Sequence, residues 1–358
     1  MANVEERAPR TGRTMTTTVL LCGDPQQPSE YMAEAAGFLE EHDVVFERMD
    51  WMGDASPAEF RNVTMDMETA GPGAYDTSDI ATHLDGVDVL VVHKAPVSRE
   101  LIEGADLDVV GAARGGTENV DVEACHDSGV TALHAPGRNR NAVADYAVSM
   151  LLSRLREIPF NHGDMIDGEW SQVFDPALLP PDVRTTTIGI VGFGHIGRGV
   201  ARRLDGFDPE ILAYDPFVDD ESIRDGGAVP VDDLHDLLGR SDAVTLHVRL
   251  SEETGGMIGA EEFASMQESA FLVNTARGGL VDEDALVAAL DDDEIAGAAL
   301  DVFRAEPLPE DHPLLSRDGV VLTPHVAGST RDAVLEGPRI VASDVEAWLR
   351  GETPEHRL

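Results

Sequence analysis

The sequence is poor in lysine, cysteine and aromatic residues, and these shortages exclude several classes of protein. Lys94 is the only lysine, and 26 basic residues face 68 acidic ones, which gives a formal net charge of −42. Because nucleic-acid binding needs clustered lysine and arginine, we expect no nucleic acid as a partner. The two cysteines, Cys22 and Cys125, show no C-x-x-C spacing. We therefore expect reduced thiols and a cytoplasmic location.

Long apolar runs and metal-binding patterns are also missing. No stretch approaches the roughly 20 apolar residues of a membrane span, so we expect no membrane partner. Residues 1–16 carry three arginines but no apolar segment follows them, which predicts an N-terminal tail and not a signal peptide. The histidines and acidic clusters lack the spacing of zinc or calcium ligands, so no metal site is predicted.

The excess of acidic residues is spread along the whole chain. This distribution favours adaptation to high salt over the alternative of an acidic partner-binding face. Such a charge destabilises a compact state by self-repulsion, and salt screens that repulsion. We therefore expect loss of structure or activity on desalting. Equal activity in dilute buffer and in about molar salt, where the screening length is about 3 Å, would contradict this prediction.

From Thr17 onward, apolar β-branched runs alternate with helical stretches, which predicts parallel sheets covered on both faces. The 358 residues suffice for two such domains. The predicted strands are 19–22, 44–49, 87–93, 109–113, 130–134, 187–191, 211–214, 243–248, 271–274, 296–300 and 320–322. Predicted helices include 31–41, 120–128, a connecting helix over 142–156, and a final helix capped by Ser329-Thr330 that ends at Leu349. Residues 159–184 are predicted to form a covering loop.

A glycine-rich turn between two of these strands predicts a dinucleotide site. The strand at 187–191 is followed by Gly192, Gly194 and Gly197 in G-x-G-x-x-G spacing, then by a helical pattern and a strand that ends at Asp215. Glycines allow backbone to approach a pyrophosphate, and the helix N-terminus offers free N–H groups. An acidic residue at that position holds the ribose hydroxyls and repels the 2′-phosphate of NADP, so NAD is favoured.

Three later stretches follow strand ends, where open α/β sheets bind their ligands. They contain Arg277, Glu306 and His325. Each alone could be an ordinary surface arginine, a loop acid or a turn histidine. Together they supply a fixed cation, an acid and an imidazole beside the predicted nicotinamide, which indicates hydride transfer.

The four motifs G-F-G-H-I-G, N-T-A-R-G-G-L-V-D-E-D-A-L, D-V-F-R-A-E-P-L-P and T-P-H-V-A-G occur in this order. They resemble the D-isomer-specific 2-hydroxyacid dehydrogenase family, which includes phosphoglycerate, glycerate, D-lactate and formate dehydrogenases. The resemblance covers about residues 85–335 well and the first 80 residues by pattern only. It implies an α/β fold of two Rossmann-like domains: an NAD-binding doubly wound parallel sheet and a flavodoxin-like substrate (lid) domain.

The resemblance also implies roles for individual residues. Arg277 would bind the carboxylate of a 2-oxo acid, His325 would be the acid–base, and Glu306 would fix its tautomer and stabilise the imidazolium. The implied NAD-binding positions are Gly192, Gly194, His195, Ile196, Gly197, Asp215, Thr275, Ala276, Asp301 and Gly328. Among them, His195 and Ile196 would contact the pyrophosphate through their backbone, and Asp301 would contact the carboxamide.

The domain boundaries follow from the same resemblance. After the tail of residues 1–16, residues 17–140 with 328–358 would form the lid domain, and residues 141–327 the NAD-binding domain. The chain ends at Leu358, so we expect no appended regulatory domain of the kind found in some phosphoglycerate dehydrogenases. Formate dehydrogenases of the family lack the glutamate at position 306, which argues against that activity.

The lid domain is expected to decide specificity. Backbone N–H groups around Gly115 and Gly116 could cradle a carboxylate, and Arg114 adds a cation that many relatives lack. We hypothesise that Lys94 and Arg114 bind a second anionic or polyhydroxylated end of the substrate, such as phosphoglycerate or a sugar-derived acid. The alternative, salt bridges with the abundant acids, is equally open.

The leading interpretation is an NAD-dependent D-2-hydroxyacid dehydrogenase or 2-oxoacid reductase that acts as a homodimer. The alternative is an NAD(H)-sensing, co-repressor-like interaction protein with the same fold, because some relatives serve in that way. The intact Arg277, Glu306 and His325 favour the enzyme without excluding the sensor.

Overall fold

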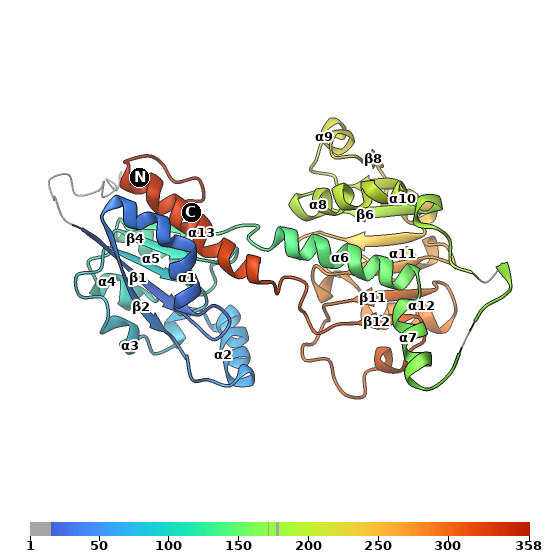
Figure 1. The fold of residues 1–358 in the computed structure, drawn as a ribbon, viewed down its shortest axis with the longest axis horizontal. Coiled ribbons are helices and arrows are strands. Elements are labelled where there is room, and N and C mark those ends of the chain that lie inside the picture. Colours follow the sequence, from blue (N-terminus) through green and yellow to red (C-terminus); the bar gives the residue numbers. More distant parts are fainter. Residues whose placement is uncertain (1–15, 171, 177–178) are drawn as a thin grey trace. The chain divides into compact units, whose positions relative to one another are not determined.

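The computed structural model describes residues 16–170, 172–176 and 179–358. It contains two compact units (Figure 1). Unit 1 comprises the chain up to Asn139 together with Thr330–Leu358, and unit 2 comprises Arg140–Ser329. The predicted tail of residues 1–16 lies outside the described residues except for its last position.

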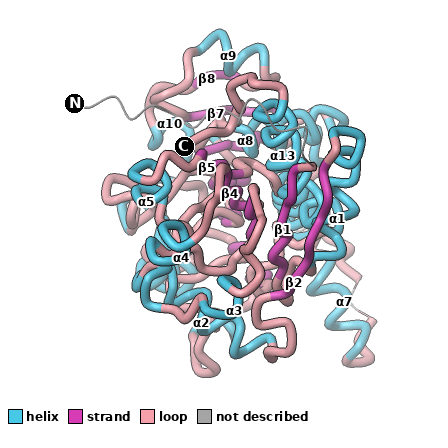
Figure 2. The backbone as a smooth tube through the Cα atoms, turned by 90° about the vertical axis from the view of Figure 1, so that its left-hand side faces the viewer, coloured by secondary structure: helices cyan, strands magenta, loops and turns pink. Residues whose placement is uncertain are grey.

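Unit 1 is built on a five-stranded sheet in which every pair of neighbours is parallel. The strand order is β2-β1-β3-β4-β5, and β1 and β2 are seen side by side in Figure 2. This is the flavodoxin-like order that the resemblance implies. The strands are β1 Thr17–Gly23, β2 Val44–Asp50, β3 Val89–Val92, β4 Val109–Ala112 and β5 Thr131–His134.

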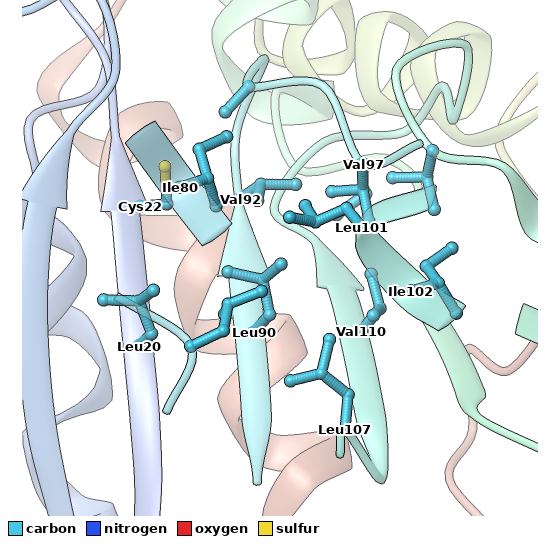
Figure 3. Packing of buried hydrophobic residues seen from close by; sticks show 14 of the residues in the cluster. Leu20, Cys22, Ile80, Leu90, Val92, Val97, Leu101, Ile102, Leu107 and Val110 are labelled. Atoms are coloured by element: carbon cyan, nitrogen blue, oxygen red, sulfur yellow. The ribbon is translucent and has the colours of Figure 1, made fainter. Parts of the chain in front are cut away.

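Helices cover both faces of the unit 1 sheet, so strand residues alternate between two buried clusters. Leu20 and Leu90 pack into one cluster (Figure 3), while Val19 and Val89 pack into the other. Both clusters exclude water from apolar side chains, the main stabilising contribution to such a fold. The first cluster receives α2, α3, α4 and α5, and the second receives α1 and α13. The helices are α1 Ser29–Ala36, α2 Pro57–Ala70, α3 Ser78–Ala81, α4 Arg99–Gly104, α5 Val122–Asp127 and α13 Arg331–Leu349.

Unit 2 is built on a seven-stranded parallel sheet with the order β12-β11-β10-β9-β6-β7-β8. The order reverses at β6, which is the switch point of a doubly wound dinucleotide-binding fold. The strands are β6 Thr187–Val191, β7 Glu210–Tyr214, β8 Val229–Pro230, β9 Ala243–Leu246, β10 Phe271–Asn274, β11 Gly297–Leu300 and β12 Val320–Leu322. The two sheets confirm the predicted fold class.

Two helical layers sandwich the unit 2 sheet as well. One buried cluster joins the sheet to α6, α8 and α9, and the other joins it to α10, α11 and α12. The helices are α6 Arg140–Leu155, α7 Ile158–Ile166, α8 His195–Leu204, α9 Asp220–Asp225, α10 Leu234–Arg240, α11 Ala260–Ser265 and α12 Glu283–Asp291.

The structure corrects three local expectations. Residues 159–184 are not all loop, because α7 occupies Ile158–Ile166. The predicted helix 31–41 is α-helical only to Ala36 and continues as a 3-10 turn over Gly37–His42. The predicted strand 243–248 ends at Leu246, after which His247 N–H donates to Val191 O at 2.7 Å beside the glycine-rich loop.

The final helix begins as predicted. The Thr330 side chain accepts a hydrogen bond from Ala333 N–H at 3.1 Å, and α13 ends at Leu349. Val341, Val345 and Trp348 of α13 are buried in the second cluster of unit 1. Within the described residues, no helix combines the length and apolarity that crossing a bilayer requires.

Candidate active site

Three neighbouring strands of unit 2 end in the residues that the sequence singled out. Arg277 follows β10, Glu306 follows β11 and His325 follows β12, and these strands are adjacent in the order β12-β11-β10. Because parallel strands share one carboxyl edge, three segments far apart in sequence meet there.

The turn that carries Arg277 is fixed by Asn274, the last residue of β10. The buried Asn274 amide donates to Arg277 O at 2.9 Å and accepts from Ala276 N–H at 3.0 Å. The Arg277 guanidinium is exposed and donates to Ala276 O at 2.7 Å. A rigid turn therefore presents a solvent-accessible permanent cation.

The loop that carries His325 is fixed by Asp301, which is fully buried at 0% exposure. Its carboxylate accepts hydrogen bonds from Thr323 Oγ1 at 2.6 Å, Val326 N–H at 3.0 Å and Ala327 N–H at 2.8 Å. Within this loop His325 adopts a φ of 55°, a left-handed conformation that non-glycine residues rarely adopt. The buried carboxylate offsets the cost of that conformation. The three hydrogen bonds use three of the roughly four lone-pair positions of the Asp301 carboxylate.

Glu306 and His325 form a close pair. Glu306 Oε2 lies 2.7 Å from His325 Nδ1, and Glu306 Oε1 accepts from Phe303 N–H at 3.0 Å. Burial raises the pKa of Glu306, but the hydrogen bonds from His325 and Phe303 and the charges of His325 and Arg277 outweigh it and hold the pKa below its ordinary value. The half-buried carboxylate is therefore ionised and accepts the Nδ1 proton.

The glycine-rich loop has the geometry of a phosphate-binding turn. Gly192 has a φ of 92°, and a Cβ there would lie 2.8 Å from the His247 backbone. A Cβ on Gly197 would lie 2.2 Å from Gly192 O, so neither position accepts a side chain. Gly194, by contrast, borders open space and caps α8 without a side-chain hydrogen bond. The helix N-terminus, with His195 exposed and Ile196 half-buried, therefore offers N–H groups to an anion.

Asp215 connects the end of β7 to that loop. Its Oδ2 accepts from Phe193 N–H at 2.8 Å and its Oδ1 accepts from Phe217 N–H at 3.0 Å. An ionised carboxylate has further lone pairs, so both oxygens can still accept ribose hydroxyls.

Two further polar atoms at this edge are buried without a hydrogen-bond partner. They are Thr275 Oγ1 and His247 Nδ1. Thr275 precedes Ala276 in the β10 turn, and burial lowers the pKa of His247 to about 3. Unsatisfied buried polar atoms are rare in proteins and indicate a missing partner. Together with the open space at Gly194, they fit a bound dinucleotide.

Gly328 follows buried Ala327 at the end of the His325 loop.

The carboxyl edge of the unit 1 sheet holds a different arrangement. Asp24 after β1 is buried and its Oδ2 lies 2.9 Å from Nδ1 of the equally buried His93 after β3. Arg138 donates to Ala333 O at 3.1 Å, and its other terminal nitrogen lies 3.4 Å from His93 Nε2. Burial lowers the pKa of His93 despite Asp24, so the ring is neutral and links an acid to a guanidinium.

The predicted lid residues all lie at this unit 1 edge. Lys94 N–H donates to Asp24 Oδ2 at 3.0 Å, and Lys94 Nζ lies 5.7 Å from the centroid of the Phe60 ring. Arg114 lies 3.4 Å from Glu118, so the salt-bridge alternative is observed for Arg114. Gly115 is exposed and Gly116 is half-buried, and both follow Arg114 directly. Burial and the nearby charge of Arg114 lower the pKa of Arg138, which shows that these cations lie within electrostatic range.

Several residues that position the site were not found from the sequence. Asn274, Asp24, His93 and Glu283 are buried polar groups with specific partners. A polar residue directly after an apolar strand is the only local signal for the first three. Glu283 lies inside the recognised motif but at a helix start, where an acid is ordinary.

Comparison with known proteins agrees with this geometry. Residues 148–327 match the NAD binding domain of the D-isomer specific 2-hydroxyacid dehydrogenase family. A D-3-phosphoglycerate dehydrogenase from Methanocaldococcus jannaschii is 39% identical over 280 residues, which cover 78% of this chain and 53% of that protein. A glyoxylate reductase from Korarchaeum cryptofilum is 40% identical over 261 residues, which cover 72% of this chain and 78% of that protein.

A solved structure of a D-lactate dehydrogenase from Sporolactobacillus sp. has a TM-score of 0.77 and 25% identity, and the match covers 96% of this chain and 99% of that one. The chain belongs to the D-isomer specific 2-hydroxyacid dehydrogenase family, whose members are oxidoreductases acting on CH–OH groups. The sequence resemblance is thus confirmed. The chain spans about half the length of the phosphoglycerate dehydrogenase that it matches.

Proposed function

We propose that this protein is an NAD-dependent D-2-hydroxyacid dehydrogenase that also catalyses the reverse reaction, the reduction of a 2-oxo acid. The observation that carries the proposal is the 2.7 Å pair between Glu306 and His325 on the strand end next to the Arg277 turn. An imidazole backed by an ionised acid, beside a fixed guanidinium, is suited to proton exchange with the hydroxyl of an anionic substrate.

The pair determines which nitrogen of His325 exchanges the proton. The Glu306 carboxylate only accepts hydrogen bonds, so Nδ1 keeps its proton and Nε2 faces the substrate. In the reductive direction Nε2 gives a proton to the carbonyl oxygen, and in the oxidative direction it takes one from the hydroxyl. Glu306 stabilises the imidazolium that exists before or after that transfer.

Arg277 would bind the substrate carboxylate, because a planar guanidinium pairs with a carboxylate in bidentate fashion. The bound dinucleotide would supply or accept the hydride exchanged with C2 of the acid. The N–H groups at His195 and Ile196 would hold its pyrophosphate, Asp215 its adenosine ribose, and Thr275, Ala276, Asp301 and Gly328 would line its nicotinamide end.

The cations of unit 1 support a substrate with a further anionic or polyhydroxylated end. Lys94, Arg114 and Arg138 lie at one sheet edge of a chain that has only 26 basic residues. Mutual repulsion among such cations is relieved by an anion, which favours phosphoglycerate or a sugar-derived acid over lactate.

A second copy of the chain is the proposed partner. Between Ile158 and Leu179, unit 2 exposes a run of apolar side chains, including Trp170 at 75% and Phe174 at 85%. Such a group favours an interaction site, and a twofold axis through it would pack the same apolar segment of a second copy against it. Light scattering in about molar salt would report the dimer.

The test of the function is NADH oxidation in high salt against a panel of 2-oxo acids with and without a phosphate. Turnover of at least one acid supports the enzyme. If NADH binds and no acid is reduced, the protein is instead the NAD(H)-sensing, co-repressor-like alternative.

A further inference from the structure

One peptide unit of unit 2, between Phe303 and Arg304, is held from two sides. On one side Arg304 N–H donates a hydrogen bond to Glu283 Oε1. On the other side lies Gly278, where a Cβ would come within 2.0 Å of Phe303 C and 2.1 Å of Phe303 O. Gly278 directly follows Arg277, so this peptide packs against the turn that carries the substrate-binding arginine.

The same turn sets the position of the acid–base pair. Phe303 N–H, one residue before the clamped N–H, donates to Glu306 Oε1 at 3.0 Å. The other oxygen of Glu306 lies 2.7 Å from His325 Nδ1. A continuous series of contacts therefore runs from Glu283 through the turn at 303–304 to Glu306 and His325.

Glu283 is a buried acid with specific hydrogen-bond partners and not a surface acid. It is 5% exposed at the start of α12, and the helix is capped by Asp282. Its Oε2 lies 3.5 Å from His312 Nε2. His312 Nδ1 accepts from Leu314 N–H at 3.3 Å, so the ring proton is on Nε2 and points to Glu283. Both carboxylate oxygens thus face donors.

The next residue provides a natural contrast. Asp284 also contacts Arg304, but through the side chain, at 3.0 Å from Arg304 Nη1, and it is 84% exposed. Exposed ion pairs of this kind contribute little to stability. Two adjacent acids therefore contact the same residue, one at its backbone in the interior and one at its side chain in solvent.

We propose that Glu283 is a positioning residue that holds the 303–304 turn and thereby the alignment of Glu306 with His325. The inference rests on the proposed acid–base role of His325. Glu283 acts at a distance from the reacting atoms, so its loss changes how firmly the imidazolium is stabilised. The carboxylate site at Arg277 stays in place, because the Asn274 side chain fixes that turn separately.

The decisive variant is Glu283→Gln, which keeps the shape but replaces one acceptor by a donor facing Arg304 N–H or His312 Nε2–H. A buried hydrogen bond to a charged group is worth about 1.5–3 kcal/mol, so kcat should fall roughly ten- to hundred-fold. The KM for the 2-oxo acid should stay within about threefold, a difference below 1 kcal/mol. The alkaline limb of the kcat/KM profile for reduction, where His325 must be protonated to act as the acid, should move to lower pH. Asp284→Asn is the matched control and should leave all three unchanged.

A readout without turnover separates this inference from the proposed function. The pH at which the His325 ring signals titrate by NMR should fall in Glu283→Gln and not in Asp284→Asn, whether or not a substrate has been found. An unshifted titration in a folded Glu283→Gln protein would overturn the inference. A lower kcat with an unshifted pH profile would assign Glu283 a structural role only, which also overturns it.

Folding of the variant is checked by thermal melting and NADH binding. If Glu283→Gln does not fold, His312→Asn removes only the second donor and keeps the Arg304 contact. The His325 titration should then shift in the same direction by a smaller amount, and an unshifted value would count against the inference.

Discussion

The two sheets of this protein are both parallel and covered by helices on both faces, but different side chains lie at their carboxyl edges. In unit 2 the edge presents Arg277 and the Glu306–His325 pair to solvent, with His325 at 50% exposure. In unit 1 the comparable positions are occupied by the buried pair Asp24 and His93, with cations around it. A solvent-accessible carboxylate–histidine pair is suited to catalysis, whereas a buried pair with cations beside it is suited to binding a ligand.

The comparison shows what burial does to a carboxylate–imidazole pair. At Glu306–His325, the His325 side chain is 50% exposed, so its ring can contact a ligand. At Asp24–His93, burial lowers the pKa of the histidine and fixes it as a neutral link to Arg138. The chemistry of an acid–histidine pair therefore depends on its solvent access more than on its distance, which is 2.7 Å in one and 2.9 Å in the other.

The largest expected effect is on the exposed pair. His325→Ala should lower kcat by roughly 10²–10⁴-fold, the usual contribution of general acid–base catalysis. His93→Ala, which changes the buried pair, should act on stability and KM instead. Steady-state kinetics on both variants would decide. A His325→Ala enzyme within a factor of two of wild type would remove His325 from the acid–base role.

A smaller effect is expected at the unit 1 edge. Lys94→Ala and Arg114→Ala should each raise KM for phosphoglycerate by roughly ten- to hundred-fold, since a charge-assisted contact is worth about 1.5–3 kcal/mol. The KM for lactate should change little. Arg99→Ala, which removes an exposed ion pair with Asp127 in the same unit, is the control. Unchanged KM values for phosphoglycerate, glycerate and lactate would discard the substrate hypothesis for both residues.

The last effect concerns pH and stability. Burial lowers the pKa of His247 from 6.5 to about 3, so the unfolded chain binds a proton that the folded unit 2 does not. This group stabilises the fold fully above pH 6.5, and the contribution is lost as pH falls toward about 3, by up to about 1.4 kcal/mol per pH unit.

His247→Gln should flatten that slope, as measured by urea unfolding between pH 7 and pH 5 at constant high salt. His93→Gln should flatten it less, because Asp24 opposes the burial effect on His93. Parallel slopes for wild type and His247→Gln would show that the histidine titrates normally in the folded protein.

Much of the fold could be predicted because its signals are local. The strands 187–191, 271–274 and 320–322 have the predicted bounds, since each is a short apolar run between turn residues. The missed helix α7 has a physical reason: Gly163, a residue that disfavours helix, lies in its interior, and none of its residues is packed into a core.

The supporting contacts of the site could not be predicted because their partners are distant. Glu283 meets a backbone N–H 21 residues away, and Asp24 meets His93 across 69 residues. The sequence indicates which residues have suitable chemistry. Only the folded chain shows that Asp301 holds the His325 loop from inside the sheet edge.

The helix α13 has a consequence for how the chain is made. Its buried face completes one of the two apolar clusters of unit 1, although the strands of that unit all precede residue 135. A chain emerging from the ribosome therefore releases the whole of unit 2 before the last part of unit 1. Domains usually fold in the order of synthesis, at about 5–20 residues per second. Here the unit begun first is completed last, and the part of its sheet face that α13 covers stays exposed while about 200 further residues are translated.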